Sequence, residues 1–242
     1  MLKLTKKMRL DKVLSNLGFG SRKDIKKLIK YGNVLVNGAL VQDPSDYVDP
    51  YNDEIILNGK PVVYREFIYL MMNKPKGVLS ATEDDKDPVV VDLLKEEDKA
   101  FSPFPVGRLD KDTEGLLLLT NDGKLAHKLT SPKKKVPKVY YADILGEVTE
   151  KDIQIFSKGV TLDDGYRTMP GHLEIIESGE ISQIQLTIYE GKFHQVKRMF
   201  QAVSKKVIYL KRIAMGELTL DENLKLGEYR HLTDEEIALL TK

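Results

Sequence analysis

The chain has 242 residues, of which 41% are hydrophobic and 7% aromatic, a composition typical of a globular protein with room for one large and one small domain. It contains no Cys, which excludes disulfides, thiol catalysis and zinc–thiolate sites. No apolar run is long enough to span a membrane, and the basic N-terminus lacks the apolar core of a signal peptide. We therefore expect a cytoplasmic protein that does not associate with membranes.

The net charge of +1 conceals an uneven distribution of basic residues. Residues 1–30 hold ten Lys or Arg against two acids, residues 124–138 hold six lysines and no acid, and residues 191–212 hold seven basic residues and no acid. These segments carry 23 of the 38 basic residues. Binding of a polyanion requires such segregation, although three separate solvated faces would give the same pattern.

Residues 8–60 have the pattern of a small α+β unit. Apolar residues at 10, 13, 14 and 17 predict a helix that ends at Gly18. Ser21, followed by Asp24, predicts the capped start of a second helix, whose apolar stripe is surrounded by Lys and Arg. Residues 34–38 and 55–59 each combine a short strand with an Asn-Gly turn. A basic helix on such a unit favours contact with phosphates.

This unit resembles an S4 RNA-binding domain. The similarity lies in Arg-Leu-Asp at 9–11, Ser-Arg at 21–22 and the Val-x-Val-Asn-Gly hairpin at 34–38. The resemblance implies that residues 1–60 dock on RNA. Residues 61–66 are expected to be a linker. The side chains expected to bind RNA are Arg9, Lys12, Arg22, Lys23, Lys26, Lys27 and Lys30.

The next segment begins with a predicted strand, residues 67–72, which ends in the turn Asn73-Lys74-Pro75-Lys76-Gly77. Asp87-Pro88 then predicts the start of a short helix at residues 89–94. Residues 95–105 have the composition of a polar loop.

A stretch with three acids, residues 107–115, runs directly into Leu116-Leu117-Leu118-Leu119. Four leucines before a Thr-Asn-Asp-Gly turn predict a strand that is buried on both faces. A carboxylate at the end of such a strand is positioned, as a catalytic group must be, although a loop that is merely solvated remains the alternative. A calcium loop is excluded, because its twelfth position would be Asn121 instead of Glu.

The remaining chain alternates predicted helices and strands. Residues 125–129 predict a brief helix, and residues 137–144 predict a strand on which Tyr140 and Tyr141 face opposite sides. On the residues alone, either Tyr is more often a core residue than a catalytic one. Residues 183–188 predict a half-buried strand. A helix follows, with Val196, Met199, Phe200 and Val203 on its buried face and His194, Lys197, Arg198 and Gln201 on a polar face. That polar face can bind phosphate, hold a carboxylate or simply be solvated. A last helix is expected from Thr233, with Glu236 completing a capping box.

Three motifs in this order resemble those of pseudouridine synthases: Gly-Arg-Leu-Asp at 107–110, Lys-Val-Tyr at 138–140 and His-Gln-Val-Lys-Arg at 194–198. The resemblance implies that Asp110 is the catalytic carboxylate and that Tyr140 lies against the target base. The family usually has Arg at position 197, so whether Lys197 or Arg198 pairs with Asp110 is left open; we expect Lys197 to be the catalytic partner. The residues expected to bind substrate are Arg108, Lys138, His194, Gln195 and Arg198.

The resemblance also implies an α+β fold, in which an S4-like domain precedes a mixed α/β catalytic domain, residues 67–242, on a largely antiparallel sheet. His194 favours the branch that modifies a uridine of small-subunit (16S) ribosomal RNA. A large-subunit (23S) enzyme and a non-catalytic RNA-binding assembly factor are the alternatives. We expect a monomer that acts on ribosomal RNA within a small-subunit assembly particle, without cofactor or metal. The sequence does not distinguish a nucleophilic Asp110 from one that acts as a base.

Overall fold

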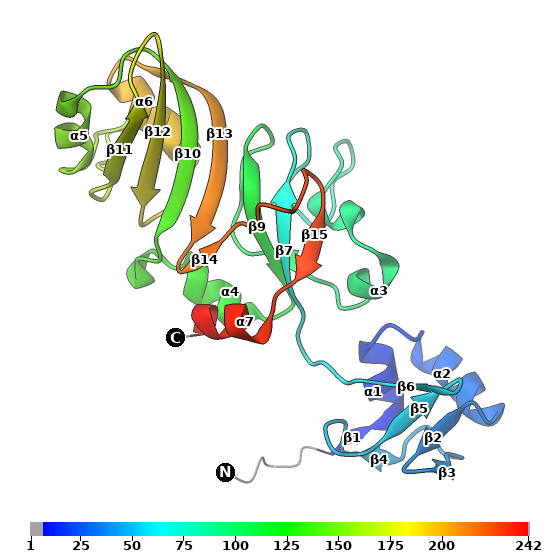
Figure 1. Ribbon diagram of the computed structural model, residues 1–242. Helices are drawn as coiled ribbons and strands as arrows, with labels where there is room; N and C mark the ends of the chain where they lie inside the picture. The colour runs from blue at the N-terminus through cyan, green and yellow to red at the C-terminus, as the bar shows by residue number, and fades with distance from the viewer. Residues whose placement is uncertain (1–6, 242) are drawn as a thin grey trace. The chain divides into compact units, whose positions relative to one another are not determined.

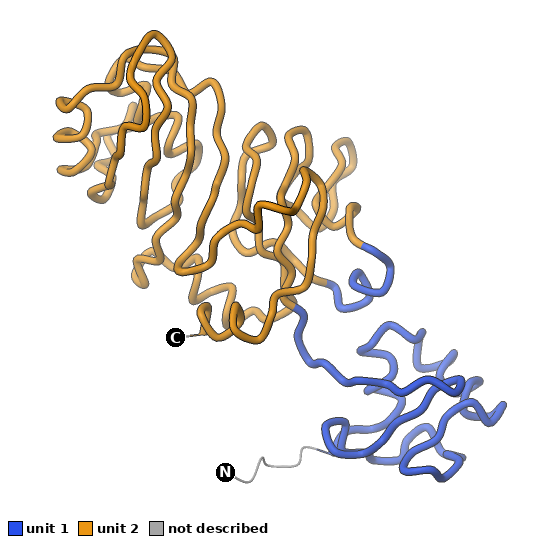
Figure 2. Tube along the Cα trace, viewed as in Figure 1, with its two compact units in different colours: residues 1–68, 95–102 blue, residues 69–94, 103–242 orange. Residues whose placement is uncertain are grey.

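The computed structural model describes residues 7–241, which form two compact units (Figures 1 and 2). Within the described residues, the first unit contains residues 7–68 together with residues 95–102, and the second contains residues 69–94 and 103–241. None of the helices within residues 7–241 is both long and apolar enough to cross a lipid bilayer.

The first unit is a small α+β fold with an antiparallel sheet of strand order β3-β2-β5-β6 and a separate β1–β4 pair. Both expected Asn-Gly turns are present, because Asn37 and Asn58 adopt the left-handed conformation that these turns need. The elements of this unit are β1 (Met8–Arg9), α1 (Leu10–Asn16), α2 (Arg22–Lys30), β2 (Val34–Val36), β3 (Ala39–Leu40), β4 (Tyr47–Val48), β5 (Ile55–Leu57), β6 (Lys60–Pro61) and α3 (Glu96–Lys99).

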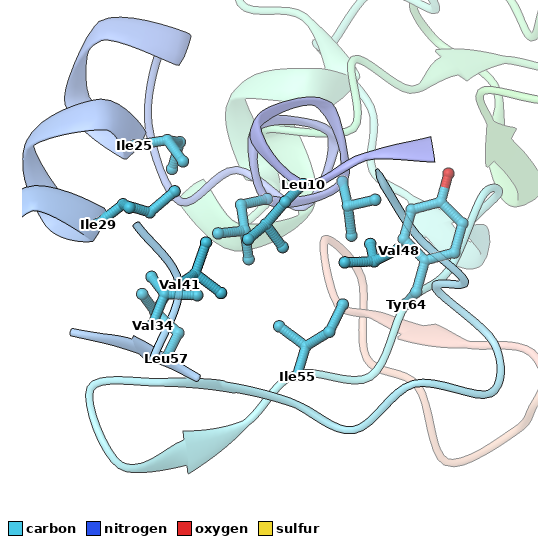
Figure 3. Close-up of a cluster of buried hydrophobic side chains, with 11 residues drawn as sticks. Leu10, Ile25, Ile29, Val34, Val41, Val48, Ile55, Leu57 and Tyr64 are labelled. Atoms are coloured by element: carbon cyan, nitrogen blue, oxygen red, sulfur yellow. The ribbon is translucent and has the colours of Figure 1, made fainter. Parts of the chain in front are cut away.

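The helices α1 and α2 cover a single hydrophobic core (Figure 3). The predicted capping box at the start of α2 is confirmed: the Ser21 hydroxyl accepts a hydrogen bond from the Asp24 N–H, and the Asp24 carboxylate accepts one from the Ser21 N–H. Ile25 and Ile29 of α2 point into the core, and the basic side chains of the helix therefore point outward.

The second unit is built on a nine-stranded, largely antiparallel sheet whose main path is β11-β12-β10-β13-β9-β7-β15, as expected. The short strands β14 and β8 pair with β13 and β9. The strands are β7 (Tyr69–Lys74), β8 (Phe104–Pro105), β9 (Glu114–Thr120), β10 (Lys138–Leu145), β11 (His172–Glu177), β12 (Ile181–Ile188), β13 (Lys206–Met215), β14 (Leu218–Thr219) and β15 (Tyr229–His231). The helical segments are η1 (Val90–Leu93), α4 (Gly123–Thr130), η2 (Pro132–Lys134), α5 (Glu150–Phe156), α6 (Gln195–Ala202) and α7 (Asp234–Thr241).

Helices pack on each half of this sheet. In one half α5 contacts β11 and α6 contacts β13 (Figure 1). The ring centroids of Phe156 in α5 and Phe200 in α6 lie 4.9 Å apart. In the other half, Leu125 and Leu129 of α4 and Leu240 of α7 join a core with the leucines of β9. Every residue of β9 is buried, which confirms the prediction of a strand buried on both faces.

The two halves meet where β9 and β13 run parallel for two residue pairs, Glu114 with Lys211 and Gly115 with Arg212. A Cβ atom at position 115 would lie 2.2 Å from the Arg212 carbonyl oxygen, and φ of Gly115 is +103°. Only glycine fits both conditions. Gly115, which directly follows the three acidic residues, therefore allows the two halves of the sheet to join beside the loop that carries Asp110.

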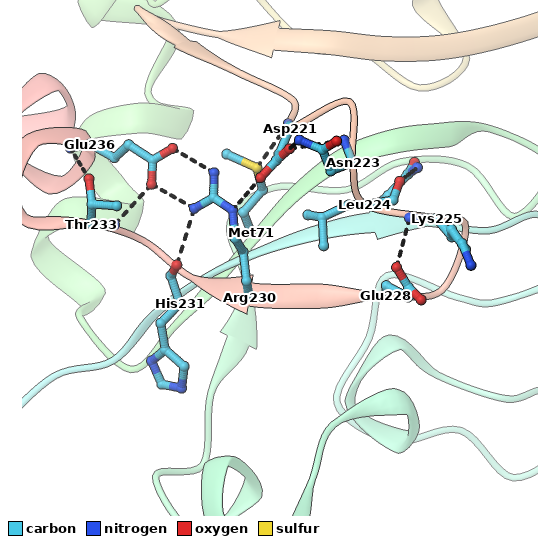
Figure 4. Close-up of polar contacts among 11 residues, drawn as sticks. Met71, Asp221, Asn223, Leu224, Lys225, Glu228, Arg230, His231, Thr233 and Glu236 are labelled. Atoms are coloured by element: carbon cyan, nitrogen blue, oxygen red, sulfur yellow. Dashed lines mark hydrogen bonds and ion pairs between the residues drawn. The ribbon is translucent and has the colours of Figure 1, made fainter.

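Arg230 of β15 ties the C-terminal helix to the sheet (Figure 4). Its Nε donates to Asp221 at 2.6 Å, and its two Nη atoms donate to the Glu236 carboxylate at 2.7 and 2.8 Å. Glu236 also accepts from the Thr233 N–H while the Thr233 hydroxyl accepts from the Glu236 N–H, so the predicted capping box is present.

Three local expectations were imprecise. The predicted turn at 73–77 begins later, because Asn73 and Lys74 still belong to β7. The short helix expected at 89–94 is the single 3₁₀ turn η1. The segment expected to be a loop, residues 95–105, contains both α3 and β8. In each case pairing or packing with distant segments changes what local composition suggests.

Candidate active site

The loop between β8 and β9, residues 106–113, presents Asp110 and is held from several sides. The Ser80 hydroxyl donates to the Leu109 carbonyl at 2.9 Å and accepts from the Leu109 N–H at 3.1 Å. The Thr113 N–H closes a turn onto the Asp110 carbonyl at 3.0 Å. The backbone around the carboxylate is thus fixed before any substrate binds.

Lys74, the last residue of β7, lies beneath this loop and has no exposed surface. Its Nζ donates to the carbonyl oxygens of Pro75, Asp110 and Thr113 at 3.0, 3.1 and 3.0 Å. Burial lowers the pKa of Lys74 to about 8, although the neighbouring acids Asp110 and Asp112 oppose that change. Lys74 is therefore a structural tie between strand and loop.

The Asp110 carboxylate faces Lys197 of α6. The Lys197 Nζ lies 3.1 Å from Asp110 Oδ2 and also contacts Asp112. Burial by itself would lower the pKa of Lys197, but the hydrogen bonds to Asp112 and Asp110 outweigh it and raise that pKa. Burial would raise the pKa of Asp112, yet the contact with Lys197 lowers it. The site therefore contains one cation shared by two carboxylates.

The residues at the start of α6 approach the same carboxylate. His194 adopts a left-handed conformation (φ +49°), which places its Nε2 3.7 Å from Asp110 Oδ1. Gln195 is buried instead of facing outward: its Oε1 accepts from the Lys192 N–H at 2.9 Å, and its Nε2 donates to Glu190 at 3.2 Å. These contacts fix the turn from which the helix begins.

Tyr140 of β10 lies on the sheet face next to this loop. It is buried and pairs in the sheet with Arg212 of β13. Tyr141 faces the opposite side, as predicted, and its hydroxyl donates to Asp143 at 2.8 Å. A cavity of about 500 Å³ opens against this face. Its lining includes Arg108, Asp110, Lys138, Tyr140, His194 and Arg212.

The structure thus brings together most of the residues expected at the site. Lys197 and Gln195 line a smaller pocket that adjoins the same loop. Arg198 instead pairs with Asp163 and Asp164 on the other side of α6 and does not line the cavity. Its expected role in substrate binding stays a prediction, and Lys197 is the side chain that contacts Asp110.

The basic residues expected to bind RNA belong to the first unit. Arg9 is partly neutralised, because its guanidinium group donates to the buried Asp11 at 2.7 Å. The other six side chains are exposed; they are Lys12, Arg22, Lys23, Lys26, Lys27 and Lys30.

Sequence reasoning assigned no role at the site to Ser80, Asp112 or Arg212, and it placed Lys74 in a turn. The Asn-Lys-Pro-Lys-Gly segment, residues 73–77, could have drawn attention to Lys74. The sequence does not show that this lysine is buried. Within residues 7–241 no cluster of His, Asp or Glu side chains is suited to hold a metal ion.

Comparison with known proteins agrees with this geometry. The model of the family "RNA pseudouridylate synthase" matches residues 68–202, and that of the S4 domain matches residues 8–55. A crystal structure of a pseudouridylate synthase superimposes with a TM-score of 0.68 at 36% identity and covers 96% of this chain and 99% of its own. Sheet, loop and S4 unit together define an RNA-modifying enzyme with a dedicated RNA-binding unit.

The chain belongs to the RNA pseudouridylate synthase family and is an RNA pseudouridine synthase, an isomerase. It is 54% identical to a Bacillus subtilis protein described as an uncharacterized RNA pseudouridine synthase, YtzG, over 97% of this chain and 99% of that one. It is 41% identical to ribosomal small subunit pseudouridine synthase A of Vibrio cholerae, over 97% and 100% of the two chains. Identity to ribosomal large subunit pseudouridine synthase B of Bacillus subtilis is 40%, over 96% and 95%.

Proposed function

We propose that the protein isomerises a uridine of small-subunit (16S) ribosomal RNA and that Asp110 is its reactive carboxylate. The observation that carries this proposal is the contact between Asp110 and Lys197 at the edge of a cavity lined by Tyr140. In the reaction the N1–C1′ bond breaks, the uracil turns, C5 bonds to C1′, and the proton lost from C5 is replaced by one on N1. No atom is gained or lost, so the reaction needs no redox partner.

Asp110 has two roles compatible with this geometry: attack on C1′, or removal of a proton at C2′. Either role uses the carboxylate as an anion, and the Lys197 ammonium group lies 3.1 Å from its Oδ2. Because Lys197 also contacts Asp112, its ammonium group is held in place without a substrate. Lys197 therefore positions and stabilises the carboxylate, and the segment containing Gln195 positions Lys197.

Tyr140 supplies a flat surface for the uracil. A uridine reaches this buried ring only after leaving its stack in the RNA, which costs a few kcal/mol. Contacts to the flanking RNA must offset that cost. Phe193, which is 75% exposed and stacks on the His194 ring at the rim of the cavity, is available to stack against a neighbouring base.

The choice of small-subunit RNA rests on His194. In the family that this chain resembles, His at this position is typical of the small-subunit branch. In this chain the His194 Nε2 lies 3.7 Å from Asp110 Oδ1. The relatives named for the two ribosomal subunits are almost equally similar to this chain, so large-subunit RNA is the competing substrate. We further propose that the substrate is presented in a small-subunit assembly particle.

Incubation with unmodified small-subunit RNA, small-subunit assembly particles and large-subunit RNA tests the proposal, when pseudouridines are mapped in each. We expect one new pseudouridine in the small-subunit substrates and none in large-subunit RNA. Asp110→Asn should abolish that product while RNA affinity changes little. A product in large-subunit RNA alone, or full activity of the Asp110→Asn variant, would contradict the proposal.

The S4 unit is proposed to dock the enzyme through the phosphates of its RNA. Lys23 and Lys26 are exposed on α2 and contribute charge without base recognition. Replacing both with Gln should weaken RNA binding and reduce the slope of log affinity against log salt by about 2. The control replaces Lys151 and Lys158 near α5, which are also exposed, with Gln. An equal change of slope in both double variants would show that the S4 unit is not the docking surface.

A further inference from the structure

Two buried cations lie on the neighbouring strands β10 and β13 and line the same cavity as the proposed catalytic carboxylate. Lys138 of β10 and Arg212 of β13 are only 6% and 2% exposed, and both line the 500 Å³ cavity. Lys138 precedes Tyr140 by two residues and therefore shares its face of the strand, and Tyr140 pairs with Arg212 in the sheet. All three side chains line the same cavity.

Within residues 7–241 neither cation forms an ion pair with an acidic side chain. The Lys138 Nζ donates to the Val136 carbonyl at 2.9 Å, and the Arg212 Nε donates to the Leu116 carbonyl at 2.8 Å. The Arg212 Nη2 is buried without a hydrogen-bond partner within residues 7–241. Burial, and to a smaller extent the neighbouring Arg212, lowers the pKa of Lys138 to about 8. Burying two cations near each other without an anion lowers the stability of the fold. Such an arrangement persists in a protein when a bound anionic ligand offsets the loss.

The other buried lysine of this region shows what a purely structural cation looks like. Lys74 donates to three carbonyl groups and has Asp110 and Asp112 nearby. Lys138 has one carbonyl partner and faces the cavity. The difference indicates that Lys138 and Arg212 do not serve the fold in the way Lys74 does.

Several other basic side chains around the cavity are already engaged. Lys197 contacts Asp110 and Asp112, and Lys111 pairs with Asp87 at 2.7 Å. An RNA phosphate that enters the cavity would meet the negative charge of the Asp110 carboxylate. Cations that are not already paired are therefore needed in the cavity lining to admit a phosphate so close to this carboxylate.

We propose that Lys138 and Arg212 form a phosphate subsite that holds the backbone phosphate next to the target uridine while its base lies on Tyr140. The proposal deepens the proposed function, since it assigns the chemistry of a second part of the same substrate. Arg212 contributes a planar fork of donors and Lys138 a compact charge, a combination suited to phosphate oxygens. The subsite would orient the flipped nucleotide by its charge, independently of the identity of the neighbouring bases.

Titration of the full-length protein with uridine, uridine 5′-monophosphate and uridine 3′-monophosphate tests this subsite. These probes require neither turnover nor knowledge of the RNA target, so a failure of the subsite is distinguishable from a failure of the proposed activity. We expect one of the monophosphates to bind at least about tenfold more tightly than uridine, and which of them does so identifies the side of the nucleotide that the subsite holds. Equal binding of all three probes by the unaltered protein would overturn the proposal.

Variants at Lys138 show whether these cations cause the preference. Lys138→Met should remove most of the preference for a monophosphate and leave uridine binding unchanged, whereas Lys138→Arg should retain it. The control is Lys134→Met, which removes an exposed lysine of the adjacent η2. Thermal denaturation gives an independent readout: a lysine with a purely structural role would lower the melting temperature when replaced, whereas removal of an uncompensated buried cation should not. If Lys138→Met kept the preference for a monophosphate, or lost equal affinity for uridine and the monophosphate, the phosphate would not bind at Lys138.

Discussion

Replacing Lys74 with Met tests whether a buried ammonium group holds the Asp110 loop in place. Lys74 has no exposed surface, and its Nζ donates to three carbonyl groups at 3.0 to 3.1 Å, two of which belong to the loop. Met fills a similar volume but donates no hydrogen bond. The variant therefore leaves three carbonyl groups without their donor and removes the link between β7 and the loop.

The size of the effect follows from these contacts. A hydrogen bond from a charged donor contributes roughly 1.5–3 kcal/mol to stability, but the burial of the ammonium group, which lowers the pKa of Lys74 to about 8, opposes part of this gain. Some freed carbonyl groups regain water when the loop moves. We expect a net loss of about 3 kcal/mol in the free energy of unfolding. Because a displacement of about 1 Å at a reacting group can cost roughly 100-fold in rate, turnover should fall by a similar factor.

Urea denaturation followed by far-UV circular dichroism measures the first effect, and single-turnover formation of pseudouridine measures the second. Hydrogen exchange at the Gly77 and Thr113 amides, which both bond to loop carbonyls, should accelerate in the variant. The matched control is Lys76→Met, because Lys76 is exposed and should change stability by less than about 1 kcal/mol. If Lys74→Met behaved like Lys76→Met in all three measurements, the structural role derived for Lys74 would be refuted.

The other predictions concern the carboxylate partner, the junction of the sheet and the buried cation. Lys197→Met should slow single-turnover pseudouridine formation by about 100-fold, because the loop carboxylates lose their shared cation, whereas Lys197→Arg should retain most of the rate; equal rates would contradict the assignment. Gly115→Ala should lower the free energy of unfolding by about 3 kcal/mol or more, since its Cβ would lie 2.2 Å from the Arg212 carbonyl oxygen. Gly165→Ala, where φ is also positive but the space is open, should cost about 1 kcal/mol, and similar losses in urea denaturation would argue against the clash. Lys138 has a pKa of about 8 in the folded protein against 10.5 as the ordinary value, so the unfolded chain binds more protons between these values and stability should rise with pH, by about 2 kcal/mol between about pH 7.5 and 9.5. In Lys138→Met the rise should be smaller by this amount, while the contribution of Lys74, whose pKa is also about 8, remains. Identical pH dependence of urea denaturation in both proteins would show that Lys138 is not buried as a cation.

Local patterns were sufficient to predict most of the secondary structure. The capping box of Ser21 and Asp24 depends on residues three apart, and the strand at residues 116–119 depends on consecutive leucines. The opposite orientation of Tyr140 and Tyr141 follows from the alternation of any β-strand. The motif around Asp110 likewise indicated the enzyme family, because a resemblance in the order of motifs does not require knowledge of the fold.

The sequence by itself thus determined most of the elements and the enzyme family. Tertiary structure alone decided that Lys197 faces Asp110 while Arg198 turns to Asp163, since adjacent residues of a helix point about 100° apart and only the seating of α6 on the sheet selects one of them. It also decided which cations are buried. Arg212 looks like an ordinary basic residue in the sequence, and it comes close to Lys138 because β10 and β13 pair across about 70 residues of chain. Burial and charge pairing are properties of such distant contacts, which no local pattern contains.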